Sequence, residues 1–166
     1  MRLHKRPNSL VKQVHQLIAT LTLPRPWHLG TFTRQVAELV GKPIELAPIA
    51  GLTAKGFPCG VMLEGTQTIV VAYDADSSAF HIEHIILHEL GHLLLDHTGC
   101  VSEQSTRNAV EILFPHFDPD NVLRVLGRSD YDNQIETQAE LFASLIMYEA
   151  RRRHPESSWE QAIFRS

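Results

Sequence analysis

Apolar side chains recur every three or four residues in two stretches near the start of the chain. Leu10, Val14 and Leu17 show this spacing, which places an apolar stripe along one side of a helix. The pattern predicts a helix from about Ser9 to Leu21 and a shorter one from about Thr33 to Val40. Prolines follow the first segment, and a glycine and a proline follow the second, as is typical where helices end.

The next part of the chain has short apolar runs rich in β-branched residues. Such runs cover Ile44 to Ile49, Cys59 to Leu63 and Thr68 to Tyr73. The sequence from Glu64 to Gln67 lies between the last two runs and is typical of a hairpin turn. We therefore expect a small, mostly antiparallel sheet of about three strands.

Helical periodicity returns in the second half of the chain. N-cap residues before Ala79 predict a long helix from about Ala79 to His97, with Gly99 as its stop. Helices followed by a small sheet and more helices indicate an α+β fold, and 166 residues suit a single domain over residues 1–166. The further predicted helices are Glu103 to Leu113, Pro119 to Leu126, Asn133 to Arg153 and Ser157 to Phe164.

Charge and composition disfavour several classes of partner. The chain has 15 basic and 19 acidic residues, a formal net charge of −4, so no overall positive field favours nucleic acid or an anionic membrane. No run is long and apolar enough to cross a bilayer, and no signal-peptide core follows the N-terminus. Cys59 and Cys100 lack the spacing of a disulfide framework or a cysteine zinc cluster. We expect a cytoplasmic protein without direct binding to nucleic acid or membrane.

The long central helix carries the motif His88-Glu89-Leu90-Gly91-His92. Residues four apart lie about 40° apart around a helix, so both imidazoles can reach one metal ion. Glu89 lies about 100° from His88, where its carboxylate can reach a water without being a ligand, as a general base must. Gly91 costs about 1 kcal/mol in a helix relative to alanine, which indicates that another group packs closely against it.

A third ligand must come from elsewhere in the chain. The metzincin pattern requires histidine at position 98, where this chain has Thr98. A carboxylate from a second helix is the other common solution for catalytic zinc. Glu136 and Glu140 share one face of the predicted helix from Asn133, with largely apolar neighbours. Because burying carboxylates there is costly without metal or hydrogen bonds, both are candidates.

Other polar residues could support such a site. His81 and His84 are predicted to project on the metal face before the motif, where they either line a cleft or solvate the end of the helix. Asp96 follows His92 by one turn and is a candidate acceptor behind a ligand imidazole. The possible oxyanion donors are Tyr131, Tyr148, His116 and His154.

Taken together, these features resemble the ImmA/IrrE family of zinc metallopeptidases. The family usually has a second glutamate where this chain has Gln138, and asparagine or aspartate where it has Glu140. It commonly has Phe-Thr where His84-Ile85 stands. The resemblance rests on overall length, on His88 to His92 in a helix after a strand hairpin, and on Glu136-x-x-Ala139-Glu140-x-Phe142-Ala143 followed by Leu145-Ile146-Met147.

The resemblance implies a zincin-like active-site helix and a gluzincin-like peptidase. In such a site Zn²⁺ is bound by His88, His92 and Glu136, and Glu140 holds a histidine ligand from behind. The expected chemistry is metal-assisted hydrolysis, in which Glu89 takes the proton of a water whose pKa is lowered to about 7. The family also implies a dedicated protein substrate, often a helix-turn-helix repressor.

Two other functions are compatible with the motif. The chain could be a non-catalytic binding module of a regulatory or toxin–antitoxin pair that retains a zinc site, but a structural site has no need of a base such as Glu89. A DNA-associated peptidase of the SprT-like kind shares the helix motif. The net charge of −4 and the lack of a cysteine zinc ribbon disfavour that function.

Overall fold

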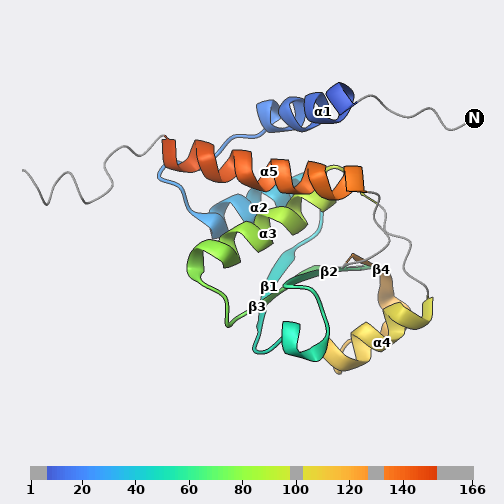
Figure 1. Ribbon diagram of the computed structural model, residues 1–166. Helices are drawn as coiled ribbons and strands as arrows, with labels where there is room; N and C mark the ends of the chain where they lie inside the picture. The colour runs from blue at the N-terminus through green and yellow to red at the C-terminus, as the bar shows by residue number, and fades with distance from the viewer. Residues whose placement is uncertain (1–6, 98–102, 127–132, 153–166) are drawn as a thin grey trace, which may run out of the picture.

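The computed structural model describes residues 7–97, 103–126 and 133–152. In this part of the chain five α-helices accompany a four-stranded mixed sheet (Figure 1), so the α+β class is confirmed with one strand more than expected. No helix of the described residues is long and apolar enough to span a membrane. The elements are α1 (Pro7–Thr20), α2 (Leu29–Val40), β1 (Ile44–Ile49), η1 (Thr53–Lys55), β2 (Gly60–Gly65), β3 (Ile69–Asp74), α3 (Ala79–Leu94), α4 (Glu103–Leu113), η2 (Pro119–Asn121), β4 (Val122–Leu126) and α5 (Asn133–Arg152).

The strands are arranged in the order β1-β3-β2-β4. β2 pairs antiparallel with β3, as the predicted hairpin requires, and also with β4, whereas β1 lies parallel to β3. The parallel pair arises because the chain leaves β1 through η1, forms β2, and returns as β3 between the two. Strand β1 has its predicted bounds, and the predicted helix Ser157 to Phe164 lies outside the described residues.

The predicted helix from Pro119 to Leu126 is wrong. Its first residues form the short 3₁₀ helix η2, and Val122–Leu126 form strand β4, which pairs with the outer edge of β2. Val125 and Leu126 are buried in the strand, whereas Leu123 is exposed. A short run of this kind fits a helical stripe as well as a strand. Pairing with the open edge of β2 satisfies backbone groups on both strands, and this favours the strand.

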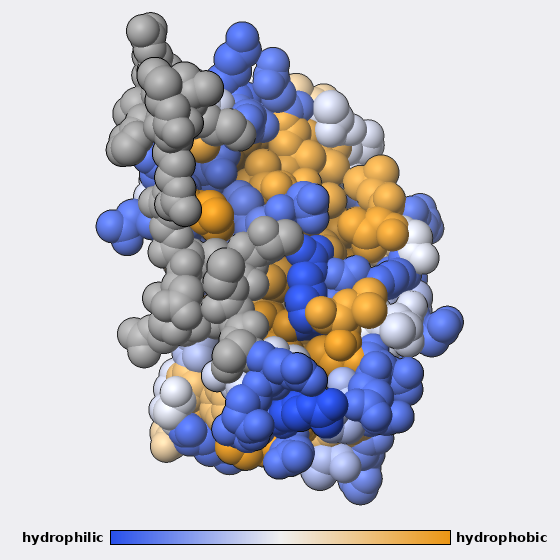
Figure 2. Space-filling model, turned by 90° about the vertical axis from the view of Figure 1, so that its right-hand side faces the viewer, coloured by the Kyte–Doolittle hydropathy of each residue, from blue (hydrophilic) through white to orange (hydrophobic). Residues whose placement is uncertain are grey.

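Both faces of the sheet are buried. Side chains alternate along a strand: Met62 and Val71 face the cluster beneath α3, whereas Leu63 and Val70 face a second cluster that includes Val110 of α4. Figure 1 shows α3 above the sheet, α5 above α3 and α1 above α5, with α4 at the opposite end. The lower end of the face in Figure 2, where α4 lies, is mainly hydrophilic, as expected for a helix that buries only one side.

Two helix ends differ from the sequence predictions by three residues or more. Helix α2 begins at Leu29 rather than Thr33, because the His28 side chain caps it by accepting a hydrogen bond from the Thr31 N–H. Histidine is not among the preferred capping residues, so the sequence contained no clear start signal. Helix α3 ends at Leu94 rather than at the predicted His97.

The end of α3 is a turn that reverses the chain at Asp96. Asp96 has a φ of 52° in the left-handed region, and its N–H donates to the Leu93 carbonyl at 3.2 Å. The His97 N–H donates to the His92 carbonyl at 3.0 Å, which completes a Schellman motif. Glycine usually occupies the left-handed position, so Gly99 was the expected stop. Because the chain turns at Asp96, before Gly99, His97 is brought back towards His92.

Helices α3 and α5 cross closely at Gly91. A Cβ atom added there would lie 2.9 Å from Cδ1 of Phe142 and 3.3 Å from its Cβ. The close packing expected from Gly91 is therefore present, and its partner is the fully buried Phe142. The crossing brings the first two turns of α5 next to the motif on α3.

We expect Gly91→Ala to destabilise the protein by about 1 kcal/mol. Overpacking a core typically costs about 1–3 kcal/mol, and this exceeds the gain of about 1 kcal/mol in helix propensity. Chemical denaturation of the metal-free protein measures the effect. In a Phe142→Ala background Cγ and Cδ1 are absent and only the contact with Cβ at 3.3 Å remains, so the cost of Gly91→Ala should fall. An increase in stability on the wild-type background would contradict the close contact.

Candidate metal centre

His88, His92 and Glu136 meet between α3 and α5. The Nε2 atoms of the two histidines are 3.0 Å apart, and each lies 3.3 Å from a carboxylate oxygen of Glu136. Their potential ligand atoms all lie within 4.8 Å of one another, and among the described residues this is the group of at least three that could hold a metal ion. The fold thus brings together the two motif histidines and the first of the two candidate glutamates.

The spacing of these atoms fits a tetrahedral metal. Zinc bonds of about 2.0–2.2 Å at tetrahedral angles place neighbouring ligand atoms about 3.3 Å apart. The two Nε2 atoms are 3.0 Å apart, and the two oxygens of Glu136 lie 3.3 Å from them, Oε2 from His88 and Oε1 from His92, so the donor atoms have separations of this order. Two imidazoles and one carboxylate suit a divalent transition metal, and three protein ligands leave a fourth position for water or substrate.

Burial keeps the two histidines in the form that binds metal. His92 is only 2% exposed, and burial, together with His88 and His97, lowers its pKa to about 3. Burial also lowers the pKa of His88, although the negative charges of Glu136 and Glu140 oppose this effect. Both rings are therefore neutral near pH 7, which is the form in which an imidazole binds metal.

Glu89 lies in the same cleft but outside the triad. It is 6% exposed, and burial followed by the charge of Glu136 raises its pKa to about 8. A cation bound beside Glu136 would oppose both effects, since it favours the charged carboxylate. A Cβ on Gly60 would lie 2.7 Å from Oε1 of Glu89 and 2.6 Å from Cγ2 of Ile85. The first residue of β2 must therefore be glycine to leave Glu89 its place, which the sequence did not indicate.

Glu140, which the family resemblance placed behind a histidine ligand, lies near Nδ1 of His88 but has its hydrogen bond with His84. Its carboxylate is 3.0 Å from Nε2 of His84 and 3.6 Å from Nδ1 of His88. The second distance is too long for a hydrogen bond, so the contact with His88 is electrostatic. Partial burial alone would raise the pKa of Glu140, but the hydrogen bond from His84 and the charges of His84 and His88 lower it overall.

The residue behind His92 is His97, not Asp96. Nδ1 of His97 lies 3.0 Å from Nδ1 of His92, and its Nε2 lies 3.1 Å from Oε1 of Gln138. Asp96 is 87% exposed and lies 3.6 Å from Arg124, so the role considered for it is wrong. A continuous helix would place His97 about 140° from His92, which is why the sequence pattern missed it.

A cleft of about 1010 Å³ opens over the triad. His81 and His84 line it together with Glu89, so these two histidines belong to the cleft. A second hollow of about 740 Å³ lies between α1, α2 and α5, away from the metal ligands. The other residues around the cleft are Thr53, Phe57, Pro58, Cys59, Gly60, Phe80, Ile85, Asn133 and Glu140.

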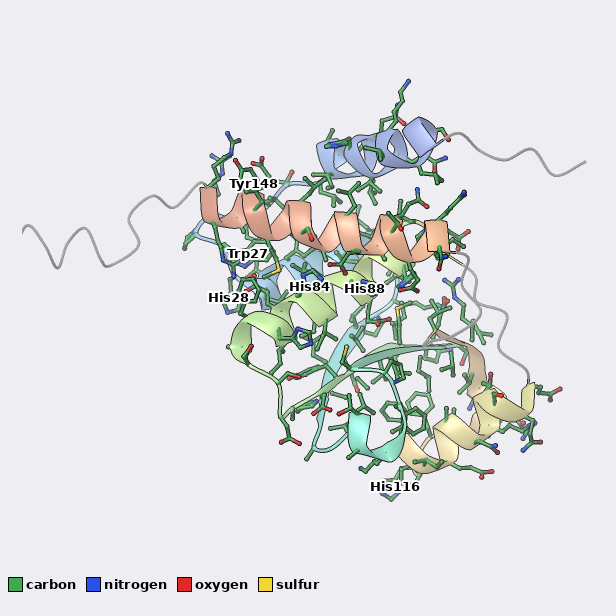
Figure 3. All side chains as sticks on the ribbon, in the orientation of Figure 1. Trp27, His28, His84, His88, His116 and Tyr148 are labelled. Carbon is green, nitrogen blue, oxygen red and sulfur yellow. The ribbon has the colours of Figure 1, made fainter. Side chains whose placement is uncertain are left out.

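Two of the proposed oxyanion donors lie away from the triad. Figure 3 shows Tyr148 on the outer side of α5 and His116 near α4, both apart from His84 and His88. Neither lines the cleft, so these two assignments are wrong. Tyr131 and His154 lie outside the described residues. Of the two histidines that precede the motif, His84 donates to Glu140, so His81 is the one with a ring N–H able to donate to a substrate oxygen.

Comparisons with protein-family models, with curated proteins and with solved structures find no match to this chain. The resemblance to the ImmA/IrrE family therefore rests on the motif residues and their order in the sequence. The fold and the geometry of the triad are the basis on which a function is proposed.

Proposed function

We propose that this protein is a zinc-dependent endopeptidase with His88, His92 and Glu136 as its metal ligands. The observation that carries the proposal is the buried carboxylate of Glu89 at the same cleft as a three-residue metal triad. A site with three protein ligands and an open position is typical of catalytic zinc, whereas structural zinc usually has four protein ligands.

Each residue of the site has a chemical role in this proposal. Zinc, when bound, supplies a Lewis acid that polarises the scissile carbonyl and makes water a better nucleophile at neutral pH. The carboxylate of Glu89 accepts the proton of the attacking water and then donates it to the nitrogen of the leaving amine. His81 offers an N–H donor at the cleft for the oxygen of the substrate carbonyl, whereas His84 donates its Nε2–H to Glu140.

A non-catalytic binding module explains fewer features of the site. A carboxyl group with a pKa raised to about 8 by burial is costly to maintain. Neither metal retention nor partner binding requires it, because Glu89 is not part of the triad. Perturbed carboxyl groups in clefts are typical of acid–base catalysts, so Glu89 favours the enzyme.

We further propose a narrow substrate range within the cytoplasm. A cleft of about 1010 Å³ accommodates a short extended segment rather than a folded domain. The substrate is then a regulatory protein that presents such a segment, and the family resemblance points to a helix-turn-helix repressor. A protein partner also agrees with the net charge of −4, which gives no general attraction to nucleic acid.

The two glutamates of α5 should differ in their effect on zinc. Wild-type protein should bind about one zinc per chain. Glu136→Ala should lose zinc because a direct ligand is removed, whereas Glu140→Ala should retain it with an affinity about 10- to 100-fold weaker. Titration against a competing chelator measures both, with circular dichroism to check folding. The reverse order of effects would exchange the two assignments.

Glu89→Gln should retain the fold and the zinc but lose hydrolysis. The amide keeps the size and the hydrogen-bonding shape of the side chain, yet it cannot accept the proton of the attacking water. Zinc content, thermal unfolding and cleavage of a substrate peptide are measured on the same preparation. Cleavage at the wild-type rate would exclude Glu89 as the general base.

Generic unfolded proteins should be poor substrates. A peptidase with one dedicated target must not degrade other cytoplasmic chains, so casein should be cleaved far more slowly than the cognate repressor. The assay incubates zinc-loaded protein with casein and with a helix-turn-helix protein encoded next to it, using Glu89→Gln as the control for contaminating proteases. Rapid digestion of casein would argue against narrow specificity.

A further inference from the structure

Gln138 of α5 links His97 to the outer helix α1. Its amide Nε2 lies 3.1 Å from the backbone carbonyl oxygen of Leu10 and 3.1 Å from Oε1 of Gln13. Its Oε1 lies 3.1 Å from Nε2 of His97, whose other nitrogen faces His92. The contacts form one continuous hydrogen-bonded chain from α1 to a metal ligand.

The contact with α1 determines which group donates and which accepts in each of these hydrogen bonds. A backbone carbonyl can only accept hydrogen bonds, so the group of Gln138 that faces Leu10 must be the NH₂ donor. The carboxamide oxygen of Gln138 consequently faces His97 and can only accept. Nε2 of His97 must therefore carry the proton that this oxygen receives.

The same reasoning continues through both imidazoles. A neutral imidazole has one N–H, and in the contact between the Nδ1 atoms of His97 and His92 only one of the two atoms can carry a proton. With the proton of His97 on Nε2, its Nδ1 is an acceptor, so Nδ1 of His92 must donate to it across 3.0 Å. Nε2 of His92 is then left without a proton, and its lone pair faces His88 and Glu136.

We propose that His97 and Gln138 are positioning residues that fix His92 in the tautomer able to bind metal through Nε2. The inference rests on the proposed function, because it takes His92 to be a metal ligand. The contacts that support it lie behind His92, on the side away from His88 and Glu136. Partners behind a metal-bound histidine typically contribute about 10- to 100-fold to metal affinity. Here the partners behind His92 are a neutral histidine, His97, and the side-chain amide of Gln138. The amide is oriented by a backbone carbonyl of α1, and no carboxylate takes part in this series of contacts.

The sheet holds His97 in place for this role. The side chain of Arg124, from β4, donates to the backbone carbonyl of His97 at 3.3 Å and forms an ion pair with Glu64 of β2. Glu64 also pairs with Lys42 at 2.8 Å. Burial alone would raise the pKa of Glu64, but its hydrogen bonds to Lys42 and Arg124 lower it. The turn after α3 is thus anchored by a charged network as well as by its backbone hydrogen bonds.

Zinc affinity and imidazole tautomer test the inference together. His97→Leu removes the acceptor and should weaken zinc binding about 10- to 100-fold in a chelator competition. His97→Asn places a carboxamide oxygen near the position of Nδ1, so it should recover most of the lost affinity. Gln138→Met should weaken binding in the wild type but have no further effect on the His97→Asn background. Gln104→Met, on the far helix α4, is the matched control and should leave affinity unchanged.

The tautomer is measured in the metal-free protein by long-range ¹H–¹⁵N correlation of the histidine side chains. His92 should carry its proton on Nδ1 in the wild type and lose this preference in His97→Leu. Unchanged zinc affinity in His97→Leu, or a wild-type His92 protonated on Nε2, would overturn the proposal. If the wild type binds no zinc, the proposed function fails, and the tautomer measurement still decides the role of His97 and Gln138.

Discussion

The geometry of the site depends on how closely α3 and α5 approach each other at Gly91. The ring of Phe142 occupies the space that a Cβ would need, with its Cδ1 only 2.9 Å from that position. Glu136 lies earlier on α5, on the stretch that faces His88 and His92, and its short side chain must span the gap between the helices. A wider separation would move the carboxylate out of ligand distance. One small residue in α3 therefore allows two distant segments of sequence to contribute to one group that could hold a metal ion.

Burial then determines the chemistry available to the site. It keeps His88 and His92 neutral, and it raises the pKa of Glu89 to about 8. The same low-polarity surroundings would strengthen the effect of a bound cation on Glu89, because screening by water is reduced. The triad and Glu89 therefore form one electrostatic unit at the cleft.

The two histidines of the motif are supported in different ways. His88 lies nearer the surface. The carboxylate of Glu140 lies 3.6 Å from its Nδ1 and accepts a hydrogen bond from His84. His92 lies in the interior, where a chain of neutral hydrogen bonds through His97 and Gln138 ends on α1. A charged partner is tolerated on the exposed side, whereas a buried carboxylate behind His92 would require compensation. The outer helix α1 is consequently part of the support of the site and more than a cover for α5.

The sequence by itself determined the features that depend on local periodicity. Helix geometry places His88 and His92 on one face with Glu89 beside them, and Glu136 and Glu140 on one face of α5. The hairpin, and the presence of helices before and after the first three strands, follow from similarly local signals. Only the tertiary structure decided the rest. Strand β4 exists because β2 offers an open edge, Gly60 is required because Glu89 fills its space, and His97 reaches His92 because Asp96 takes a left-handed turn before the expected stop. These features depend on contacts between segments far apart in the chain, or on a turn conformation without its usual glycine, and no periodic pattern of residues encodes either.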